Sequence, residues 1–422
     1  MDNNHVIPDR MVRPKNGRTN RYQKTNTAFV LGLFETGLGA VRSLGKAGIN
    51  VIGLESNPGM PGFKSRYCKA KLCPDPVHEP QKLLAFLLKE GKKQQEKGVL
   101  FPSTDAFVLF MSRNRSELSK CFHFALSSSQ VVEAIVNKKL QYEMAQRIGT
   151  PYPQTLYPET MEEVEQIKDQ VIYPAFIKPY YSHLWREKFD NKGFKVDDAQ
   201  QLCERYREII PTGLKAMVQS IILGPNTNHF KVCAYMGEDN NPLLIFTLRK
   251  IRQYRTDFGI GTLVESLKYE ELAQLGMQFF KGIQYRGIGS IEFKKDERDD
   301  KLKMIELNPR LWQQNYQATR CGMNFPLVQY LHLTGQKVHL QTDFTEGIKW
   351  FNATADFQAF WDYFRKGELM PWSWVLSWID SKAFATFATD DIRPFLSAND
   401  YGMKYLRMPL YLLKQRRAGK NA

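Results

Sequence analysis

Acidic, amide and cationic side chains alternate in the stretch IELNPR, where Glu306, Asn308 and Arg310 are spaced two residues apart. Side chains of a strand alternate between its faces, so Glu306 and Asn308 are expected on one face, together with Met304. If the earlier run GSIEF pairs with this strand so that even-numbered positions face one another, Glu292 joins them. Two carboxylates and an amide oxygen suit a hard cation, and such an incomplete ligand set favours Mg²⁺. The alternative is an edge hairpin whose polar face is merely solvated.

Isolated cations follow apolar strand patterns elsewhere. The run YPAFIKP places Lys178 after buried-type residues, where a lysine either acts at a site or extends its ammonium group to solvent. In TLRKIRQYRTDFGIG, strand alternation sends Lys250 and Arg252 to one face and Arg249 and Arg255 to the other. We expect Lys250 or Arg252 to contact a phosphate or an acidic substrate, and a solvated basic face is the alternative.

Composition indicates a soluble globular protein. The chain has 422 residues, 43% hydrophobic and 24% charged, enough for two or three packed domains. A net charge of +15 favours anionic partners such as nucleotides, phosphorylated substrates, nucleic acid or an acidic membrane surface, although a solvated cationic face would also produce it. The six cysteines contain no CxxC pair and read as reduced thiols of a cytoplasmic protein. Residues 1–26 are basic without an apolar core, so we expect a disordered arm there.

Two strand–turn–helix patterns open the fold. The first runs from Thr27 to Ser56 and the second begins at GVLFPSTDAFVLF, which together predict a doubly wound parallel α/β domain over residues 27–128. Gly32, Gly37 and Gly39 do not have the GxGxxG spacing of a dinucleotide site. We expect these glycines to serve a tight turn and close helix packing.

The pattern changes after a helix predicted in NKKLQYEMAQRIG. Short apolar runs between residues 172 and 250 predict an antiparallel sheet, and GIGSIEFKK and KLKMIELNP predict a hairpin. Residues 341–422 hold five tryptophans and a basic tail, which favours a small helical C-terminal extension with the tryptophans in its core or at an interface. The apolar and basic residues after 405 could rest peripherally on the anionic inner face of a membrane.

Taken in order, the motifs NKKLQYEMAQRIG, YPAFIKP, MVQSIILG, GSIEF and IELNPR resemble the ATP-grasp superfamily of carboxylate-amine ligases, in its amino-acid and peptide ligase branch that includes D-aspartate ligases. The resemblance implies an ATP-grasp domain at residues 129–340 with a small lobe at about 172–223. The glycines that the family usually carries after Lys178 are missing from YYSHLWREKFDNKG. Ser182, His183 and Arg186 could contact phosphate or substrate there instead.

The resemblance also implies roles for individual residues. ATP phosphates would contact Lys138 and Lys178, and the usual aspartate before the first lysine is here Asn137. The adenine would hydrogen-bond to the backbone of a hinge formed by Gln219, Ser220, Ile221 and Ile222. Mg²⁺, or Mn²⁺ in its place, would lie on Glu292, Glu306 and Asn308, with Arg310 on phosphate or substrate.

The implied reaction is the ATP-dependent formation of an amide. A substrate carboxylate attacks the γ-phosphate to give an acyl phosphate and ADP, and an amine then displaces phosphate. The expected substrates are a small-molecule carboxylate and amine, from an amino acid, a peptide or a cell-envelope precursor. An ATP-grasp kinase or carboxylase-type enzyme is the alternative on the same scaffold. A basic nucleic-acid-binding protein is a further alternative, but no nucleic-acid module is recognised, so no nucleic acid is expected as a partner.

Overall fold

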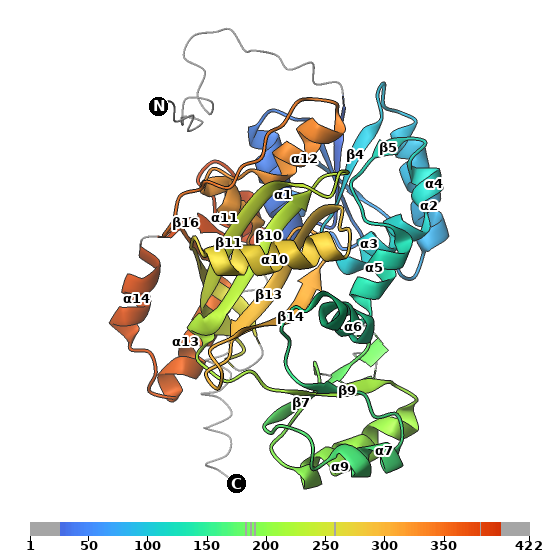
Figure 1. The fold of residues 1–422 in the computed structure, drawn as a ribbon. Coiled ribbons are helices and arrows are strands. Elements are labelled where there is room, and N and C mark those ends of the chain that lie inside the picture. The colour runs from blue at the N-terminus through green and yellow to red at the C-terminus, as the bar shows by residue number, and fades with distance from the viewer. Residues whose placement is uncertain are drawn as a thin grey trace, which may run out of the picture. The chain divides into compact units, whose positions relative to one another are not determined.

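The computed structural model describes residues 26–397, except residues 182, 183, 186, 187, 190, 257, 258 and 380 (Figure 1). The chain forms two compact units. Unit 1 contains the residues up to 125, residues 251–267 and those from 310 onward, and unit 2 contains residues 126–250 and 268–309. The units differ from the linear domains expected at 27–128, 129–340 and 341–422, because the chain enters unit 1 three times.

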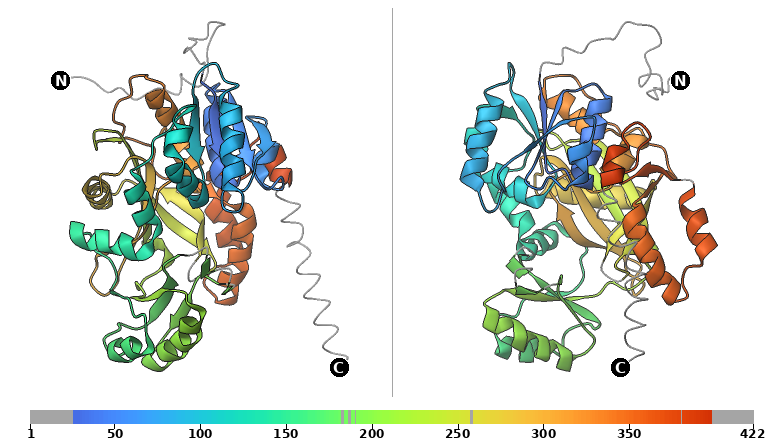
Figure 2. Two further views of the ribbon diagram at one scale, coloured as in Figure 1. Left: turned by 90° about the vertical axis from the view of Figure 1, so that its right-hand side faces the viewer. Right: turned by 180° about the vertical axis from the view of Figure 1, so that it is seen from behind.

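A five-stranded parallel sheet, in the order β3-β2-β1-β4-β5, forms the centre of unit 1 and confirms the predicted parallel α/β fold. Its strands are β1 (Ala28–Leu31), β2 (Val51–Glu55), β3 (Lys69–Leu72), β4 (Gly98–Pro102) and β5 (Phe122–His123). The helices around it include α1 (Glu35–Lys46), α2 (Pro80–Gly91), α3 (Asp105–Arg113) and α4 (Arg115–Leu118). Figure 2 shows α1 and α2 on opposite faces of this sheet, which explains why β1 and β2 are apolar on both sides.

The order of the strands reverses between β1 and β4, since the chain proceeds from β1 towards one edge of the sheet and from β4 towards the other. At such a switch point the carboxyl ends of the strands open a binding crevice in α/β proteins. Gly32 follows β1 with a φ of +90°, and the Ser103 hydroxyl donates a hydrogen bond to its carbonyl at 3.0 Å. A Cβ on Gly37 would lie 1.9 Å from the same carbonyl. The glycines therefore serve the tight turn and helix packing, as expected.

The later segments of unit 1 contain strands and helices from residue 260 onward. They comprise β12 (Ile260–Ser266), β15 (Lys349–Phe351), β16 (Ser381–Phe384), α11 (Asn315–Arg320), α12 (Phe325–Leu333), α13 (Ala353–Arg365) and α14 (Pro371–Ile379). Trp350 is fully buried, whereas Trp372 on α14 is 72% exposed. The tryptophans are therefore divided between a core position and an exposed helix. The predicted membrane-binding tail and the basic arm before residue 26 lie outside the described residues, within which no helix is long and apolar enough to cross a bilayer.

Unit 2 contains four antiparallel strands, in the order β14-β13-β10-β11, of a seven-stranded sheet. These strands are β10 (His229–Met236), β11 (Pro242–Tyr254), β13 (Gly287–Lys295) and β14 (Leu302–Asn308), and β11 continues into unit 1 from residue 251. Helix α10 (Glu270–Gly282) crosses β10 and β13 (Figure 1). Its residues Leu272 and Phe279 belong to the core beneath it, as their helical spacing indicates.

A smaller antiparallel sheet, in the order β6-β9-β7-β8, forms the other part of unit 2. Its strands are β6 (Thr155–Leu156), β7 (Ala175–Pro179), β8 (Phe194–Val196) and β9 (Ala216–Ser220). Helices α7 (Met161–Ile167) and α9 (Ala199–Ile209) cover one face (Figure 1). The predicted antiparallel pattern between residues 172 and 250 is thus confirmed.

Helices α5 (Ser129–Val136) and α6 (Lys138–Ile148) also belong to unit 2. The side-chain oxygen of Asn137 accepts hydrogen bonds from the backbone N–H groups of Lys139 and Leu140, and so caps α6. An amide oxygen can accept these bonds as a carboxylate would, which explains why asparagine suffices at this position. Gly149 ends the helix with a φ of +77°, as its sequence position predicted.

Candidate functional site

The hairpin of β13 and β14 brings the predicted metal ligands to one face of unit 2. Glu292 lies directly opposite Glu306, and Ser290 lies opposite Asn308, so even-numbered positions do pair. The register then shifts, and Phe293 lies opposite Met304. The shift leaves Ile305 as the extra residue of a β-bulge.

The bulge changes which side chains share a face. Met304 is fully buried and packs in the same core as Leu302 and Leu307. Glu306 and Asn308 remain half-buried beyond the bulge. The prediction that Met304 shares their face was therefore wrong, because strict alternation does not continue through a bulge.

Lys138, at the first position of α6, forms an ion pair with Glu306. Its Nζ lies 3.0 Å from Glu306 Oε2, and the Asn308 amide nitrogen donates to Glu306 Oε1 at 3.2 Å. The Lys138 ammonium group holds the pKa of Glu306 well below its usual range. The first predicted phosphate lysine and two predicted metal ligands are therefore in direct contact.

Two side chains of α6 fix this helix to the edge strand β14. The Gln141 side chain accepts a hydrogen bond from the Leu307 N–H at 2.9 Å and donates one to the Leu307 carbonyl at 3.1 Å. The Tyr142 hydroxyl donates to the carbonyl of Ile305, the extra residue of the bulge. Gln141 thus substitutes for a neighbouring strand, and this attachment positions Lys138 over Glu306.

Glu292 has a lysine partner that the sequence interpretation did not identify. Lys231 on β10 lies directly opposite Glu292 on β13, and its Nζ is 3.0 Å from Glu292 Oε1. Burial alone would raise the pKa of Glu292, but Lys231 and Lys250 outweigh this effect and lower the pKa. Alternation within HFKVCAYM could have indicated that Lys231 and the buried Val232 lie on opposite faces of the strand. Only knowledge that β10 pairs with β13 would have connected Lys231 to Glu292.

Lys178 lies on β7, where the apolar run predicted it. Its Nζ donates a hydrogen bond to Gln219 Oε1 on β9 at 2.6 Å, and Gln219 Nε2 donates to Thr155 Oγ1 at 2.8 Å. Burial lowers the pKa of Lys178 to about 8, and the nearby charge of Lys138 acts in the same direction. The side chain of Gln219 therefore positions Lys178.

The predicted hinge consists of the last two residues of β9, Gln219 and Ser220, and the two residues that follow it. The Ser220 N–H donates to the Gln154 carbonyl at 2.9 Å, and the Ile221 N–H donates to the Pro174 carbonyl at 2.8 Å. The Ile221 carbonyl accepts a hydrogen bond from Arg298 at 2.9 Å. These three backbone groups are already satisfied within unit 2, which restricts the part of the hinge that a ligand can use.

The two cations predicted on β11 have different environments. Burial lowers the pKa of Lys250 to about 8, while the negative charge of Glu292 opposes this shift. Lys250 thus belongs to the same charged cluster as Glu292 and Lys231. His229 is also close, since burial and then the charges of Lys250, Lys294 and Lys178 lower its pKa well below the usual value.

Arg252 does not have the exposure that a phosphate contact would require. It is 4% exposed and forms a bidentate pair with the fully buried Asp356, with Nη2 to Oδ2 at 2.7 Å. Asp356 also accepts hydrogen bonds from Thr262 and Trp374. Of the two cations expected to contact phosphate, Arg252 is instead held in this buried pair. The sequence could not reveal the pair, because the acid lies more than one hundred positions later.

Arg310 lies in unit 1 at the switch point of the parallel sheet. Its Nε donates to Asp105 Oδ1 at 2.7 Å, and Asp105 begins α3 immediately after β4. At the end of the neighbouring β1, the buried Glu35 accepts hydrogen bonds from Gln313 and Asn352. Burial raises the pKa of Glu35 to about 7 despite these two bonds. Two carboxylates and a guanidinium group therefore mark this edge of the sheet.

The candidate metal ligands are two carboxylates and one amide. Within the described ranges, no group of three His, Cys, Asp or Glu side chains comes together that could hold a metal. An all-oxygen set of three side chains fits Mg²⁺ that receives its other ligands from phosphate and water. The donor chemistry of Glu292, Glu306 and Asn308 therefore fits the ion that the sequence indicated.

Ser182, His183 and Arg186 are outside the described residues.

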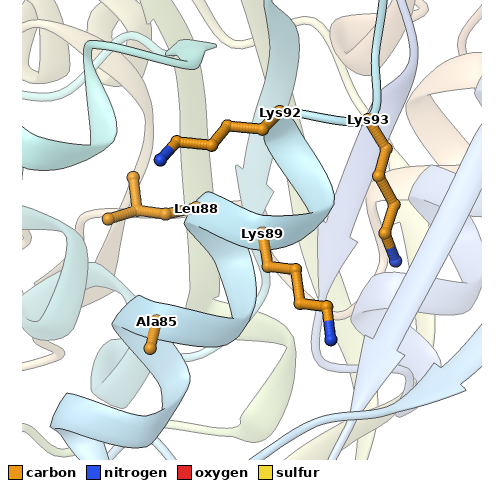
Figure 3. Close-up of a pocket in the computed structure, with 5 residues that line it drawn as sticks. All are labelled: Ala85, Leu88, Lys89, Lys92 and Lys93. Carbon is orange, nitrogen blue, oxygen red and sulfur yellow. The ribbon is translucent and has the colours of Figure 1, made fainter.

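A pocket of about 490 Å³ on α2 is lined by Ala85, Leu88, Lys89, Lys92 and Lys93. Figure 3 shows that the ammonium group of Lys92 points away from that of Lys93. Because these surface lysines point apart, they do not form a binding site for one anion.

No protein-family model matches the chain. The sequence is 25% identical over 260 residues to a D-aspartate ligase of Enterococcus faecium (strain Aus0004). That match covers 59% of this chain and 62% of the relative, which is less than two thirds of the relative's length.

Solved structures give a broader match. N5-carboxyaminoimidazole synthetase from Staphylococcus aureus has a TM-score of 0.59 at 14% identity, covering 77% of this chain and 80% of that one. Biotin carboxylase from Campylobacter jejuni has a TM-score of 0.59 at 17% identity over 77% and 74% of the two chains. An L-amino acid ligase from Bacillus licheniformis has a TM-score of 0.55 at 15% identity over 75% of each. The chain is thus a homologue of a D-aspartate ligase and has the ATP-grasp fold that its motifs indicated.

Proposed function

We propose that the protein is an ATP-dependent ligase that forms an amide between a carboxylate and an amine, releasing ADP and phosphate. The observation that carries this proposal is the pairing of Glu292 with Glu306 across the hairpin, with Lys138 in contact with Glu306. This constellation suits a metal-bound polyphosphate. The homology to a D-aspartate ligase and the likeness to a carboxyaminoimidazole synthetase complexed with ADP support it.

The lysines of unit 2 would bind the phosphates of ATP. Lys138, Lys178 and Lys250 surround the two carboxylates from three different elements, and burial has lowered the pKa of Lys178 and Lys250. An anionic phosphate restores the charged form of a buried lysine, because the opposite charge compensates for lost hydration. These side chains would therefore hold the phosphates and disperse the charge that develops during transfer.

The hinge would select adenine through two backbone groups. Because the N–H groups of Ser220 and Ile221 and the carbonyl of Ile221 already have partners, adenine would meet the Ser220 carbonyl and the Ile222 N–H. A carbonyl acceptor and an N–H donor complement the amino group and the ring nitrogen of adenine. Guanine presents the opposite pattern at these positions.

Glu292, Glu306 and Asn308 would hold Mg²⁺, or Mn²⁺ in its place. When bound, the ion supplies charge neutralisation to the phosphate oxygens. The side chains would otherwise contribute by positioning the substrates, since the described part of the site has no Ser/His/Asp or Cys/His set for nucleophilic catalysis. Lys138 would keep Glu306 ionised and oriented for this ligand role.

In the proposed reaction, a carboxylate oxygen of the first substrate forms a bond to the γ-phosphorus, and the bond from that phosphorus to ADP breaks. The nitrogen of the amine then attacks the acyl carbon, phosphate leaves, and the nitrogen loses its proton. Arg310, two residues beyond Asn308, would bind phosphate or a substrate carboxylate in a bidentate manner. To do so it would exchange its ion pair with Asp105 for the ligand.

The substrate is proposed to bind at the switch point of unit 1, where Glu35, Asp105 and Arg310 lie at the ends of β1 and β4. Anionic and cationic groups at one edge suit an amino acid or a peptide terminus, which carries both charges. The named relative acts on D-aspartate, and a cell-envelope precursor remains the other proposed substrate class.

A screen of paired substrates tests the proposal. Purified protein, ATP and Mg²⁺ are incubated with single acids, single amines and their pairs, D-aspartate included, while ADP and phosphate are measured. Release of both only when an acid and an amine are present supports a ligase. Transfer to a single substrate would indicate a kinase, and dependence on bicarbonate would indicate a carboxylase-type enzyme.

A further inference from the structure

Lys231 is placed beside Glu292 by the register of the sheet. The two residues face one another on neighbouring strands β10 and β13, and their side chains are only 13% and 22% exposed. Facing residues of an antiparallel pair have Cβ atoms about 5 Å apart, so the backbone itself keeps the two groups together. The register of the two strands therefore favours the ion pair of 3.0 Å, in addition to the conformation of the two side chains.

Each candidate metal-binding carboxylate is influenced by two lysines. Lys138 and Lys178 act on Glu306, and Lys231 and Lys250 act on Glu292. The four ammonium groups exceed the two carboxylates by two positive charges when all are ionised. ATP carries about four negative charges near neutral pH, so its complex with one Mg²⁺ carries about two. The charge of this cluster thus complements ATP with one divalent ion.

Building on the proposed nucleotide site, we propose that Lys231 occupies the position of a second divalent cation beside Glu292, so that the protein binds its nucleotide with a single Mg²⁺. Lys231 is a fixed internal cation. It pairs with the Glu292 oxygen that a second ion would require. The single ion is assigned to the other oxygen of Glu292, to Asn308 and to Glu306, whose Oε2 has Lys138 beside it.

The chemistry of the two cations favours this arrangement. A second Mg²⁺ at Glu292 would lie close to an ammonium group, and their repulsion is strong in a half-buried site because water screens it poorly. Mg²⁺ also needs about six oxygen ligands in octahedral geometry, whereas an ammonium group is satisfied by three acceptors in a flexible arrangement. Lys231 therefore provides positive charge where a complete ligand shell for a second ion is missing.

The number of bound ions tests this proposal without measuring turnover. Mn²⁺ replaces Mg²⁺, a non-hydrolysable ATP analogue is added in excess over protein, and the bound Mn²⁺ is counted by electron paramagnetic resonance and by calorimetry. We expect one tightly bound Mn²⁺ per chain in the unchanged protein and two in Lys231→Glu, which adds a carboxylate opposite Glu292. Lys89→Glu, with the same charge change on the exposed surface of α2, should retain one.

Lys231→Gln serves as a second variant in case the glutamate prevents folding. It frees the Glu292 oxygen without adding a charge, and a second Mn²⁺ should bind at least about tenfold more weakly than the first, since one carboxylate ligand fewer is available. Two tight ions in the unchanged protein, or one ion in both Lys231 variants, would overturn the inference. If the analogue does not bind to the unchanged protein at all, the proposed nucleotide site itself fails, and the single-ion inference fails with it.

Discussion

Gln141 of α6 hydrogen-bonds to both backbone groups of Leu307, the residue between Glu306 and Asn308. Both residues are almost fully buried. The side-chain amide of Gln141 therefore pairs with the backbone groups at the edge of β14 as another strand would. The same helix begins with Lys138, whose ammonium group lies on Glu306. The relationship links the fold of unit 2 to the charge arrangement of the candidate site.

Gln141→Met should test this link, because methionine retains the approximate volume and removes both hydrogen bonds to Leu307, together with the one that the Gln141 amide donates to the Ile135 carbonyl at 2.8 Å. The buried N–H and carbonyl of Leu307 would lose their partners, at a cost of about 2–4 kcal/mol in the free energy of unfolding. Denaturant titration measures this loss, and nucleotide affinity should fall as Lys138 loses its fixed position. A change below about 0.5 kcal/mol would show that the pairing contributes little.

Asp356→Ala should destabilise unit 1 strongly, since it leaves the buried guanidinium group of Arg252 without its counter-ion. Breaking such a buried pair costs about 3–5 kcal/mol. Arg252→Met, which removes the charge and keeps much of the side-chain volume, is the matched variant and should be milder in thermal unfolding. If Arg252→Met folds normally but raises the KM for ATP about tenfold or more, the structural role assigned here would be wrong and the phosphate role restored.

Nucleotide affinity should depend on pH above about 8, the pKa that burial gives to Lys178 and Lys250. Below that pH both lysines are already charged, so phosphate binds without proton uptake. As pH rises through 8 the free protein loses these charges, and binding must recover the protons, so affinity falls. Calorimetry at pH 8.5 in buffers of different ionisation enthalpy should show net proton uptake, reduced in Lys178→Met. No uptake in the unchanged protein would contradict the assignment of both lysines to phosphate.

The nucleotide base should be discriminated at the hinge. With the Ser220 carbonyl as acceptor and the Ile222 N–H as donor, GTP loses both hydrogen bonds and leaves buried polar groups unpaired. Each unmade bond costs about 1–3 kcal/mol, so the two together should make GTP bind at least about 30-fold more weakly than ATP. Competition of each nucleotide against a fluorescent ATP analogue measures the ratio. Equal affinity would mean that the base lies elsewhere.

Local patterns predicted much of this fold. The parallel sheet, the hairpin and the helix ending at Gly149 followed from apolar periodicity and turn residues, which act over a few positions. The pairing of Glu292 with Glu306 followed from matching even-numbered positions of the two strands, because this match holds as far as the bulge. The N-cap role of Asn137 was not predicted, although its residue type favours that position.

Features that depend on distant segments were not predictable in the same way. The bulge at Ile305 moved Met304 into the core, and nothing in the alternation of β14 marks it. The sequence predicted that Arg252 could contact a ligand, but in the structure it is paired with the buried Asp356. The contact of Lys231 with Glu292 depends on the pairing of β10 with β13. For Arg252 and Lys231, tertiary contacts decided whether the charge is structural or belongs to the candidate site.

We propose that unit 2 uses Glu306 to support ATP-dependent ligation. The most direct measurement is the yield of ADP, phosphate and amide with an active acid and amine pair, in the unchanged protein and in Glu306→Gln. We predict equal amounts of the three products, and a rate at least about 100-fold lower in the variant, whose thermal unfolding should show an intact fold. Formation of ADP without amide, or an unchanged rate in Glu306→Gln, would contradict the account.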